Sequence, residues 1–327
     1  MNMLRERALR LPAVTEHMWS QVDEEHRNLV SEFLEVNSFR DKTRKQYTSN
    51  LLQFFWWVHT SLNGKKLYKI TKRDFLRYIS FLKNRNMSSS AMNLKKASVS
   101  SLCNYIENVV AEDDENYEKF RNFTRGLPPI PKTQTYDKVK VTYEDYREMM
   151  KVLEGDENYL GMAWLATAFN VGARKAEIIQ LKSEIVNYEI PEGQNYVLSN
   201  IVVAKGRGEG KHVQYMVNME AIEYIKLWLD KRGYEHEDIF TTRYGGEIKR
   251  ISESWSSWFC DEVLSDILGR RINPHLFKAS CITYLLEVKK IPIELVSKFV
   301  AQHEDISTTI KHYDLRTFEE EKNNIFK

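Results

Sequence analysis

Residues 158–181, NYLGMAWLATAFNVGARKAEIIQL, join a long apolar run to a charged turn, and the fold of the chain can be inferred outward from them. The apolar run is typical of a helix. A Gly-Ala turn then precedes Arg174, and Glu177 follows three residues later on the same face of the helix that starts there. An arginine held by a nearby carboxylate keeps its guanidinium in a fixed orientation, which suits bidentate binding of a phosphate. A surface ion pair on a helix is the alternative.

The patterns on either side predict a mainly α-helical chain of two domains. Between residues 23 and 124, apolar residues recur at three- and four-residue spacing behind Ser, Thr or Asp caps, which predicts four or five helices. Residues 125–138 hold three of the seven prolines and no apolar period, so we place a linker there. Residues 139–327 are again mostly helical, but a glycine-rich hairpin at 196–218 predicts a small antiparallel sheet. We assign residues 1–22 to an N-terminal extension.

Charge is distributed in blocks that the net charge of +2 conceals. Residues 37–100 hold 14 Lys or Arg and two acids, whereas residues 107–120 hold six acids and one lysine. Each phosphate that a cation contacts releases counterions, so the basic block indicates a face that binds a nucleic acid. A solvated basic helical surface is the alternative. The candidate DNA contacts are Lys42, Arg44, Lys45, Lys72, Arg73, Lys95 and Lys96, together with Arg207 and Lys211 of the hairpin.

Several classes of protein and site are not indicated. Cys103, Cys260 and Cys281 lie far apart, without the paired spacing of disulfides or metal sites, so we expect buried thiols in a reducing, cytoplasmic setting. The longest apolar stretches are too short to cross a bilayer, so no membrane role is expected. The chain has no P-loop and no carboxylate cluster spaced for a divalent cation. We therefore expect neither a cofactor nor a metal.

Two further groups of polar residues follow Arg174 in the second domain. Lys205 ends the first strand of the hairpin, and a lysine on a mobile hairpin can donate a proton to a leaving oxygen. His275 and Lys278 lie one helical turn apart, a spacing at which two groups can bracket the oxygens of a phosphate. Basic hairpins and His-x-x-Lys spacings are common, so each group is ambiguous by itself.

Near the carboxyl end, HEDISTTIKHYD places Tyr313 ten positions after His303. Such a tyrosine is either packed under the last helix or a nucleophile. In the order Arg, Lys, His-x-x-Lys, His, Tyr, the second domain resembles a tyrosine recombinase of the phage-integrase type. AFNVGARKAEIIQL resembles the family's first arginine box, HLFKASCITYLLE its His-x-x-Arg helix, and LVSKFVAQHEDISTTIKHY its segment leading to the nucleophile. TRKQYTSNLLQFFWWV and SSSAMNLKKASVSSLCNYI resemble helices of its core-binding domain.

The resemblance implies that this protein cleaves and rejoins DNA at specific sites. Tyr313 would attack the scissile phosphate, form a 3′-phosphotyrosyl bond and free a 5′-hydroxyl. The phosphodiester energy would be stored in the protein–DNA link, so neither metal nor nucleotide is needed. By the same resemblance, Arg174, His275 and Lys278 would bind the non-bridging oxygens of the phosphate. Lys205 would protonate the leaving oxygen, and His303 would hydrogen-bond the phosphate. Glu177 would orient Arg174.

The resemblance also implies the architecture and the partners. Residues 23–124 would form a helical domain that binds core-site DNA, and residues 139–327 a catalytic domain with the DNA breaking-rejoining fold. The partners would be duplex DNA with paired core sites and three further copies of the chain, in a cytoplasmic complex at the nucleoid. The tail would link the copies of this tetramer by docking on a neighbour, with packing on its own domain as the alternative. We predict one helical face for its apolar residues, Leu315, Phe318, Ile325 and Phe326.

The chain departs from the family pattern in two places. Lys278 stands where the family has a second arginine, which keeps the charge but loses the bidentate fork. VAQH stands for the usual Leu-Gly-His and removes the glycine before His303. These departures favour one alternative function, a DNA-binding regulator that has lost strand cleavage. The other alternative function is a type IB topoisomerase. The tail after Tyr313 and the short hairpin favour a recombinase over it. Positions nine and ten after His303 are His312 and Tyr313, and only the tyrosine suits a nucleophile.

Overall fold

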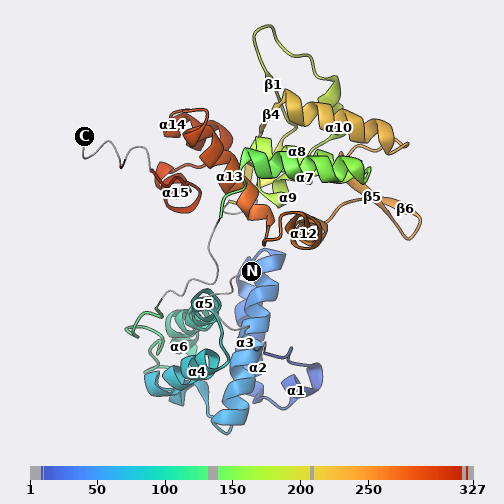
Figure 1. Ribbon diagram of the computed structural model, residues 1–327. Helices are drawn as coiled ribbons and strands as arrows, with labels where there is room; N and C mark the ends of the chain where they lie inside the picture. The colour runs from blue at the N-terminus through green and yellow to red at the C-terminus, as the bar shows by residue number, and fades with distance from the viewer. Residues whose placement is uncertain (1–8, 10, 132–138, 207–209, 319–321, 323–327) are drawn as a thin grey trace. The chain divides into compact units, whose positions relative to one another are not determined.

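The computed structural model describes residues 9, 11–131, 139–206, 210–318 and 322 (Figure 1). The chain folds as two compact units, residues 2–137 and 138–327, and each has its own hydrophobic core. The division falls at the carboxyl end of the proline-rich segment 125–138. Arg207 lies outside the described residues, as do Ile325 and Phe326 of the tail.

Within the described residues, the regular elements of the first unit are all helical, and residues 114–131 are turns and irregular chain. Phe54, Phe55 and Tyr78 are fully buried at its centre. Thr71 and Asp74 cap one helix reciprocally, because each side chain accepts a hydrogen bond from the other's backbone amide. The elements are α1 (Glu16–Ser20), α2 (Glu24–Val36), α3 (Asp41–Ser61), a 3₁₀ turn (Leu67–Lys69), α4 (Lys72–Asn84), α5 (Ser89–Tyr105), a π-helical turn (Ile106–Val110) and α6 (Ala111–Asp113).

The amino-terminal boundary differs from the expected one. Residues 16–22 are part of the first unit, because the Trp19 ring lies 6.5 Å from the Phe55 ring and Val22 is buried. Thr15 begins this segment as the N-cap of α1, where its hydroxyl accepts a hydrogen bond from the Met18 amide at 3.2 Å. The prediction of an extension that reaches residue 22 is therefore wrong for its last residues.

In the second unit, α8 is the central helix, and α7, α10 and α13 pack around it (Figure 1). Almost every side chain of α8 is buried, which accounts for the apolar run in its sequence. The helical elements are α7 (Tyr143–Gly155), α8 (Tyr159–Val171), α9 (Lys175–Ile178), a 3₁₀ turn (Ser183–Asn187), α10 (Met219–Lys231), α11 (Glu253–Trp258), a π-helical turn (Phe259–Leu264), α12 (Ser265–Ile267), α13 (Pro274–Glu287), α14 (Ile293–Leu295), a second π-helical turn (Val296–Val300) and α15 (Ile306–His312).

The strands of the second unit form short antiparallel pairs. The predicted hairpin consists of β1 (Tyr196–Leu198) with β4 (Met216–Asn218) and, beyond them, β2 (Val202–Ala204) with β3 (Lys211–Val213). Ala204 lies opposite Lys211 in this register. A further pair, β5 (Thr241–Tyr244) with β6 (Glu247–Arg250), was not predicted. Its signal is the Gly245-Gly246 turn, both of whose residues have positive φ, between two strand-length runs. The mainly α fold with small antiparallel sheets is confirmed.

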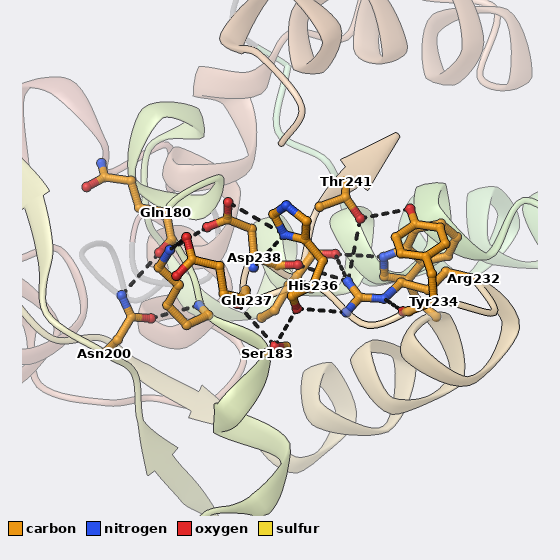
Figure 2. Close-up of polar contacts among 12 residues, drawn as sticks. Gln180, Ser183, Asn200, Arg232, Tyr234, His236, Glu237, Asp238 and Thr241 are labelled. Atoms are coloured by element: carbon orange, nitrogen blue, oxygen red, sulfur yellow. Dashed lines mark hydrogen bonds and ion pairs between the residues drawn. The ribbon is translucent and has the colours of Figure 1, made fainter. Parts of the chain in front are cut away.

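A buried arginine organises the loop between α10 and β5 (Figure 2). The guanidinium of Arg232 donates hydrogen bonds to the carbonyls of Tyr234, His236 and Asp238, each at 2.9 Å. The Ser183 hydroxyl donates to the His236 carbonyl at 2.8 Å, which ties the segment after α9 to the same loop. This network holds the segment that follows α9, the helix whose first turn begins next to Arg174.

The tail is not helical between residues 314 and 318. Residues 314–318 are irregular, and the Leu315 amide donates a hydrogen bond to the Thr283 hydroxyl at 3.0 Å instead of continuing α15. Leu315 packs against the core of its own unit, whereas Phe318 is exposed and has φ of +57°. The predicted helical face is therefore wrong for Leu315 and Phe318. Within the described residues, every helix is too short or too polar to span a bilayer.

Candidate active site

Arg174 is held at the start of α9 by the turn that ends α8. Gly172 has φ of +69°, and a Cβ atom there would lie 2.8 Å from Cγ1 of Val300, so only glycine fits this turn. The Arg174 amide donates to Oε2 of Glu177 at 2.7 Å, and Nη1 donates to Oε1 at 3.0 Å. The carboxylate thus holds both the backbone and the guanidinium of Arg174.

Glu177 is itself buried and strongly hydrogen-bonded. The Tyr215 hydroxyl, which comes from the loop between β3 and β4, donates to Oε2 at 2.6 Å. Burial alone would raise the pKa of Glu177, but the Tyr215 hydroxyl, the Arg174 amide and the positive charge of Lys278 together lower it below its ordinary value. The carboxylate therefore stays ionised and keeps the guanidinium in one orientation.

Tyr313 lies directly after α15, with its hydroxyl beside Arg174. Nη2 of Arg174 donates to Oη of Tyr313 at 3.4 Å. The ring centroids of Tyr313 and His303 are 4.8 Å apart. Thr283 of α13 fixes the backbone here, because its hydroxyl donates to the Tyr313 carbonyl at 3.3 Å and accepts from the Leu315 amide. The tyrosine is therefore docked in its own unit, among the cationic side chains.

His303 follows a backbone position with left-handed geometry. Gln302 has φ of +57° and stands where the resembled family has glycine, the residue that adopts this region without strain. Its side chain donates to the carbonyls of Gln214 and Phe299 at 3.2 and 3.1 Å, which holds the loop. Nδ1 of His303 is 2.8 Å from the Thr309 hydroxyl. These hydrogen bonds hold the loop with a non-glycine residue in the left-handed region.

Lys278 is placed differently from the expectation. Its side chain is fully buried, Nζ donates to the Ala301 carbonyl at 2.8 Å, and Nζ lies 5.6 Å from the Tyr313 ring centroid. Burial, followed by the charge of Arg174, lowers the pKa of Lys278 to about 8. Since α13 turns this side chain into the core, the expected direct grip on a phosphate oxygen is not available in this arrangement. Lys278 instead supplies a buried charge behind the phenol.

His275 occupies the first turn of α13, where Asn273 is the N-cap and its side chain accepts from the Leu276 amide at 3.2 Å. His275 is exposed. Partial desolvation and the positive charges of Lys175 and Arg174 hold the pKa of His275 below its ordinary value. The neighbouring Lys175 donates to the Ser257 hydroxyl at 2.7 Å, which fastens α9 to α11.

The hairpin approaches this cluster through one of its lysines. Nζ of Lys211 donates to the Gln302 carbonyl at 3.4 Å and lies 3.8 Å from Oε1 of Glu304. Lys205 directly follows β2, and its side chain is exposed. The structure thus brings Arg174, Lys278, His303 and Tyr313 together, and within the described residues no hydrogen bond or ion pair joins Lys205 to them.

The basic residues of the first unit have two kinds of environment. The exposed or half-buried ones lie on α3, α4 and α5, and they are Lys42, Arg44, Lys45, Lys72, Arg73 and Lys96. Lys95 differs, because its side chain is buried and Nζ donates to Oδ1 of Asn50 at 3.1 Å and to the Gln53 side chain. Burial lowers the pKa of Lys95 to about 8. The expectation that Lys95 contacts DNA is corrected: it joins α5 to α3.

Sequence reasoning missed the residues that support the cluster. Tyr215 and Thr283 hold Glu177 and Tyr313, but nothing in their spacing marks them. Thr309, whose hydroxyl lies 2.8 Å from Nδ1 of His303, has a weak signal, since it belongs to the Ser-Thr-Thr run between His303 and Tyr313. Within the described residues, no group of three or more His, Cys, Asp or Glu could hold a metal ion.

The arrangement can stabilise negative charge around a phenolic oxygen. Arg174 contacts that oxygen, Lys278 lies behind the ring, and His303 packs on its face. Fixed positive groups of this kind lower the energy of a transition state in which charge develops on a phosphate. A phenol placed among them suits nucleophilic attack at phosphorus.

Comparisons with known proteins point in the same direction. The sequence profile of the phage integrase family matches residues 140–320. The chain is 76% identical over 325 residues to the SPbeta prophage-derived recombinase-like protein YomM of Bacillus subtilis strain 168, across 99% of this chain and 98% of that protein. It is 24% identical over 277 residues to the tyrosine recombinase XerA of Pyrococcus horikoshii, across 85% of this chain and 84% of XerA.

Solved structures share the fold. The Tn1549 transposon integrase in complex with circular intermediate DNA has a TM-score of 0.66 at 13% identity, covering 92% of this chain and 98% of that one. The XerH site-specific recombinase bound to palindromic difH substrate has a TM-score of 0.66 at 16% identity, covering 99% of this chain and all of that one. At these identities the similarity is one of fold.

Proposed function

The chain belongs to the phage integrase family of tyrosine recombinases, and from that premise we propose that it cleaves and rejoins duplex DNA through a 3′-phosphotyrosyl intermediate. The observation that carries the proposal is the contact between Arg174 and the Tyr313 hydroxyl, made within one chain. YomM, named as prophage-derived, suggests that the reaction integrates, excises or resolves a mobile element.

In the proposed mechanism Tyr313 attacks the scissile phosphate. Arg174, oriented by Glu177, and His275 bind the non-bridging oxygens. His303 hydrogen-bonds the phosphate, and Lys278 contributes its charge from within the core. A phenol is a modest nucleophile, so the rate depends on positive charge fixed where negative charge develops.

The leaving 5′ oxygen needs a proton, and Lys205 is our candidate donor. Lys205 directly follows β2, while Lys211 at the start of β3 already contacts the loop that carries His303. Closure of the hairpin on bound DNA would bring Lys205 to the leaving oxygen. Conformational steps of this kind are common when an enzyme assembles its site on its substrate.

We propose that the first unit binds core-site DNA through its exposed cations. They lie on three different helices, so together they offer contacts to the backbone of a duplex. Two sites and four copies of the chain would make up the recombining complex, in the cytoplasm at the nucleoid. The tail beyond Phe318 would link the copies, since the chain up to Leu315 is anchored in its own unit.

A covalent-trapping experiment tests the proposal. Wild-type protein incubated with a nicked, radiolabelled cognate site is expected to yield a denaturant-resistant protein–DNA adduct, and Tyr313→Phe is expected to yield none. His312→Phe is the matched control, because it alters the neighbouring aromatic residue and leaves the phenol. An adduct that survives Tyr313→Phe would contradict the assignment of the nucleophile.

Burial of Lys278 and the non-glycine backbone at Gln302 favour a second candidate, a DNA-binding regulator without strand cleavage. Such a protein would shift the cognate site in an electrophoretic assay but form no adduct with it. A type IB topoisomerase would form the adduct and relax supercoiled plasmid, yet exchange no strands between two sites. The three outcomes are distinct.

A further inference from the structure

Tyr215 lies at the base of the hairpin, between β3 and β4, and its backbone is fastened to the opposite side of the hairpin. Its amide donates to the Ser199 hydroxyl at 3.0 Å, and its carbonyl accepts from the Ser199 amide at 2.9 Å. Ser199 follows β1 and precedes β2, so these two bonds close the hairpin where its strand pairs meet. Both residues are 1% exposed. The position of Tyr215 therefore depends on the base of the hairpin.

The side chain of Tyr215 reaches from the hairpin to the carboxylate that holds Arg174. Its hydroxyl donates to Oε2 of Glu177 at 2.6 Å, and the same oxygen accepts from the Arg174 amide at 2.7 Å. Burial first, and then the negative charge of Glu177, raise the pKa of the Tyr215 phenol above its ordinary value. The hydroxyl therefore stays protonated and remains a donor. The carboxylate is thus held between the hairpin on one side and the arginine on the other.

The base of the hairpin also contacts the loop that carries His303. The side-chain amide of Gln302 donates to the Gln214 carbonyl at 3.2 Å. Nζ of Lys211, at the start of β3, donates to the Gln302 carbonyl at 3.4 Å. Gln214 directly precedes Tyr215 in the chain. A single two-residue segment therefore touches both this loop and the carboxylate.

We propose that the hairpin sets the orientation of Arg174 through Tyr215 and Glu177. This inference rests on the proposed function and names the element that regulates that site. A displaced hairpin would lengthen the bond from Tyr215 to Glu177, and a carboxylate with one donor fewer holds the guanidinium less firmly. Tyr215 is thus a positioning residue, because it acts on the phosphate through two other side chains.

The arrangement joins two requirements of the proposed reaction. Lys205 directly follows β2, so the element that would deliver the acid to the leaving oxygen also orients the cation beside the Tyr313 hydroxyl. Strand cleavage needs the acid and the cation in place at the same moment. A displaced hairpin would therefore remove both groups at once.

The orientation of Arg174 can be measured without any DNA. In protein labelled with ¹⁵N at arginine, the two Nη nitrogens of a held guanidinium give separate signals, and those of a rotating guanidinium average. Arg174→Lys identifies the Arg174 signals by their loss. We expect separate signals in the wild type. We expect averaged signals in Tyr215→Phe, which lacks only the hydroxyl, and in Ser199→Ala, which frees the Tyr215 amide from the hairpin.

Tyr146→Phe is the matched control. Tyr146 is also fully buried in the second unit, and its hydroxyl also donates to a carboxylate, Oε1 of Glu220, at 2.9 Å. Within the described residues, no hydrogen bond joins this pair to Arg174 or Glu177. Tyr146→Phe should therefore lose a similar amount of stability in thermal unfolding but keep the separate Arg174 signals. Averaged signals in this control would overturn the inference, because any loosened core would then free the guanidinium.

Adduct formation on the nicked site gives the second readout. Tyr215→Phe and Ser199→Ala are each expected to slow it on the order of 10-fold, the usual effect of one hydrogen bond to a charged group. Affinity for the uncleaved site should stay within about two-fold, since neither side chain is a DNA contact. Tyr146→Phe should change neither quantity. The double variant should be little slower than either single one, because both changes break the same connection.

The outcomes separate this inference from the proposed function. Separate Arg174 signals in Tyr215→Phe or in Ser199→Ala would overturn the inference, as would losses of rate that multiply in the double variant. Absence of any adduct from the wild type, with the expected signals, would instead overturn the proposed function and leave the connection between the hairpin and Arg174 supported. Should Tyr215→Phe fail to fold, Ser199→Ala carries the same comparison.

Discussion

The two units of the protein hold their positive charge in different ways. In the first unit, Lys45, Lys72 and Arg73 are exposed on helical surfaces. In the second, Arg174 is bonded to a buried carboxylate and Lys278 to a backbone carbonyl. An exposed side chain pays the entropy of ordering only when a phosphate arrives, whereas a tethered one has paid it on folding. The first arrangement suits many interchangeable contacts, and the second suits catalysis at one atom.

The largest expected effect breaks the tethered arrangement. Arg174→Ala removes the cation beside the Tyr313 hydroxyl and should lower the rate of adduct formation by about 10²- to 10³-fold, the usual loss for one preorganised donor. Affinity for the uncleaved site should change only a few-fold. Single-turnover cleavage and a binding titration measure the two quantities. Equal losses of rate and affinity would mean that Arg174 is an ordinary DNA contact.

Two buried lysines, one in each unit, sharpen the comparison at high pH. Lys278 and Lys95 have a pKa of about 8, below the ordinary 10.5. Between pH 8 and pH 10.5 these two lysines are protonated in the unfolded chain but largely deprotonated in the folded one. The free energy of unfolding therefore rises with pH over this range. Each lysine accounts for at most about 3 kcal/mol of that rise. Lys278→Met and Lys95→Met should each remove its own share.

Denaturant unfolding at pH 8 and at pH 10.5 measures that rise for the wild type and both variants. Lys65→Met is a suitable control, since Lys65 is partly exposed and paired with Asp74. A rise that stays complete in Lys278→Met would show that the amine of Lys278 keeps its proton throughout this range.

A smaller effect concerns the loop before His303. Gln302→Ala keeps a Cβ at φ of +57° and loses both side-chain hydrogen bonds, whereas Gln302→Gly loses the same bonds but relieves the backbone. Gln302→Gly should therefore be the more stable of the two by about 1 kcal/mol. Thermal unfolding of the two variants measures the difference. Equal stability would mean that the loop relaxes to another backbone conformation.

The smallest effect belongs to the exposed cations. Lys45→Ala should weaken binding of the cognate site a few-fold at moderate salt and reduce the slope of log affinity against log salt by about 0.9, the value for one phosphate contact. Lys119→Ala, an exposed lysine in the acidic stretch of the same unit, should leave the slope unchanged. A slope that falls equally in both variants would indicate a general charge effect and no local contact.

The fold was predictable where local patterns determine it. The apolar run of α8, the Gly172 turn and the three-residue spacing of Arg174 and Glu177 are all visible in one stretch of sequence. The β5–β6 hairpin was visible too, but a Gly-Gly turn between short strands is a weaker signal than a helical period.

The candidate site was only partly predictable, because the burial of a side chain depends on how separate elements pack. Counting charges marks Lys95 and Lys96 alike, yet α5 turns one into the core and leaves the other half-buried. Tyr215 lies 38 residues from the carboxylate that it holds, and Thr283 lies 30 residues from the tyrosine that it fixes. Such pairs form only when separate elements pack, so no local spacing reveals them.

The Thr283 hydroxyl donates to the Tyr313 carbonyl and accepts from the Leu315 amide. These two hydrogen bonds bear on which copy of the chain supplies the nucleophile to a given site. They fasten the nucleophile to the same polypeptide that supplies Arg174, so every copy should cut with its own tyrosine. Mixing an Arg174→Ala preparation with a Tyr313→Phe preparation should then rescue no cleavage, because neither partner can lend the missing half.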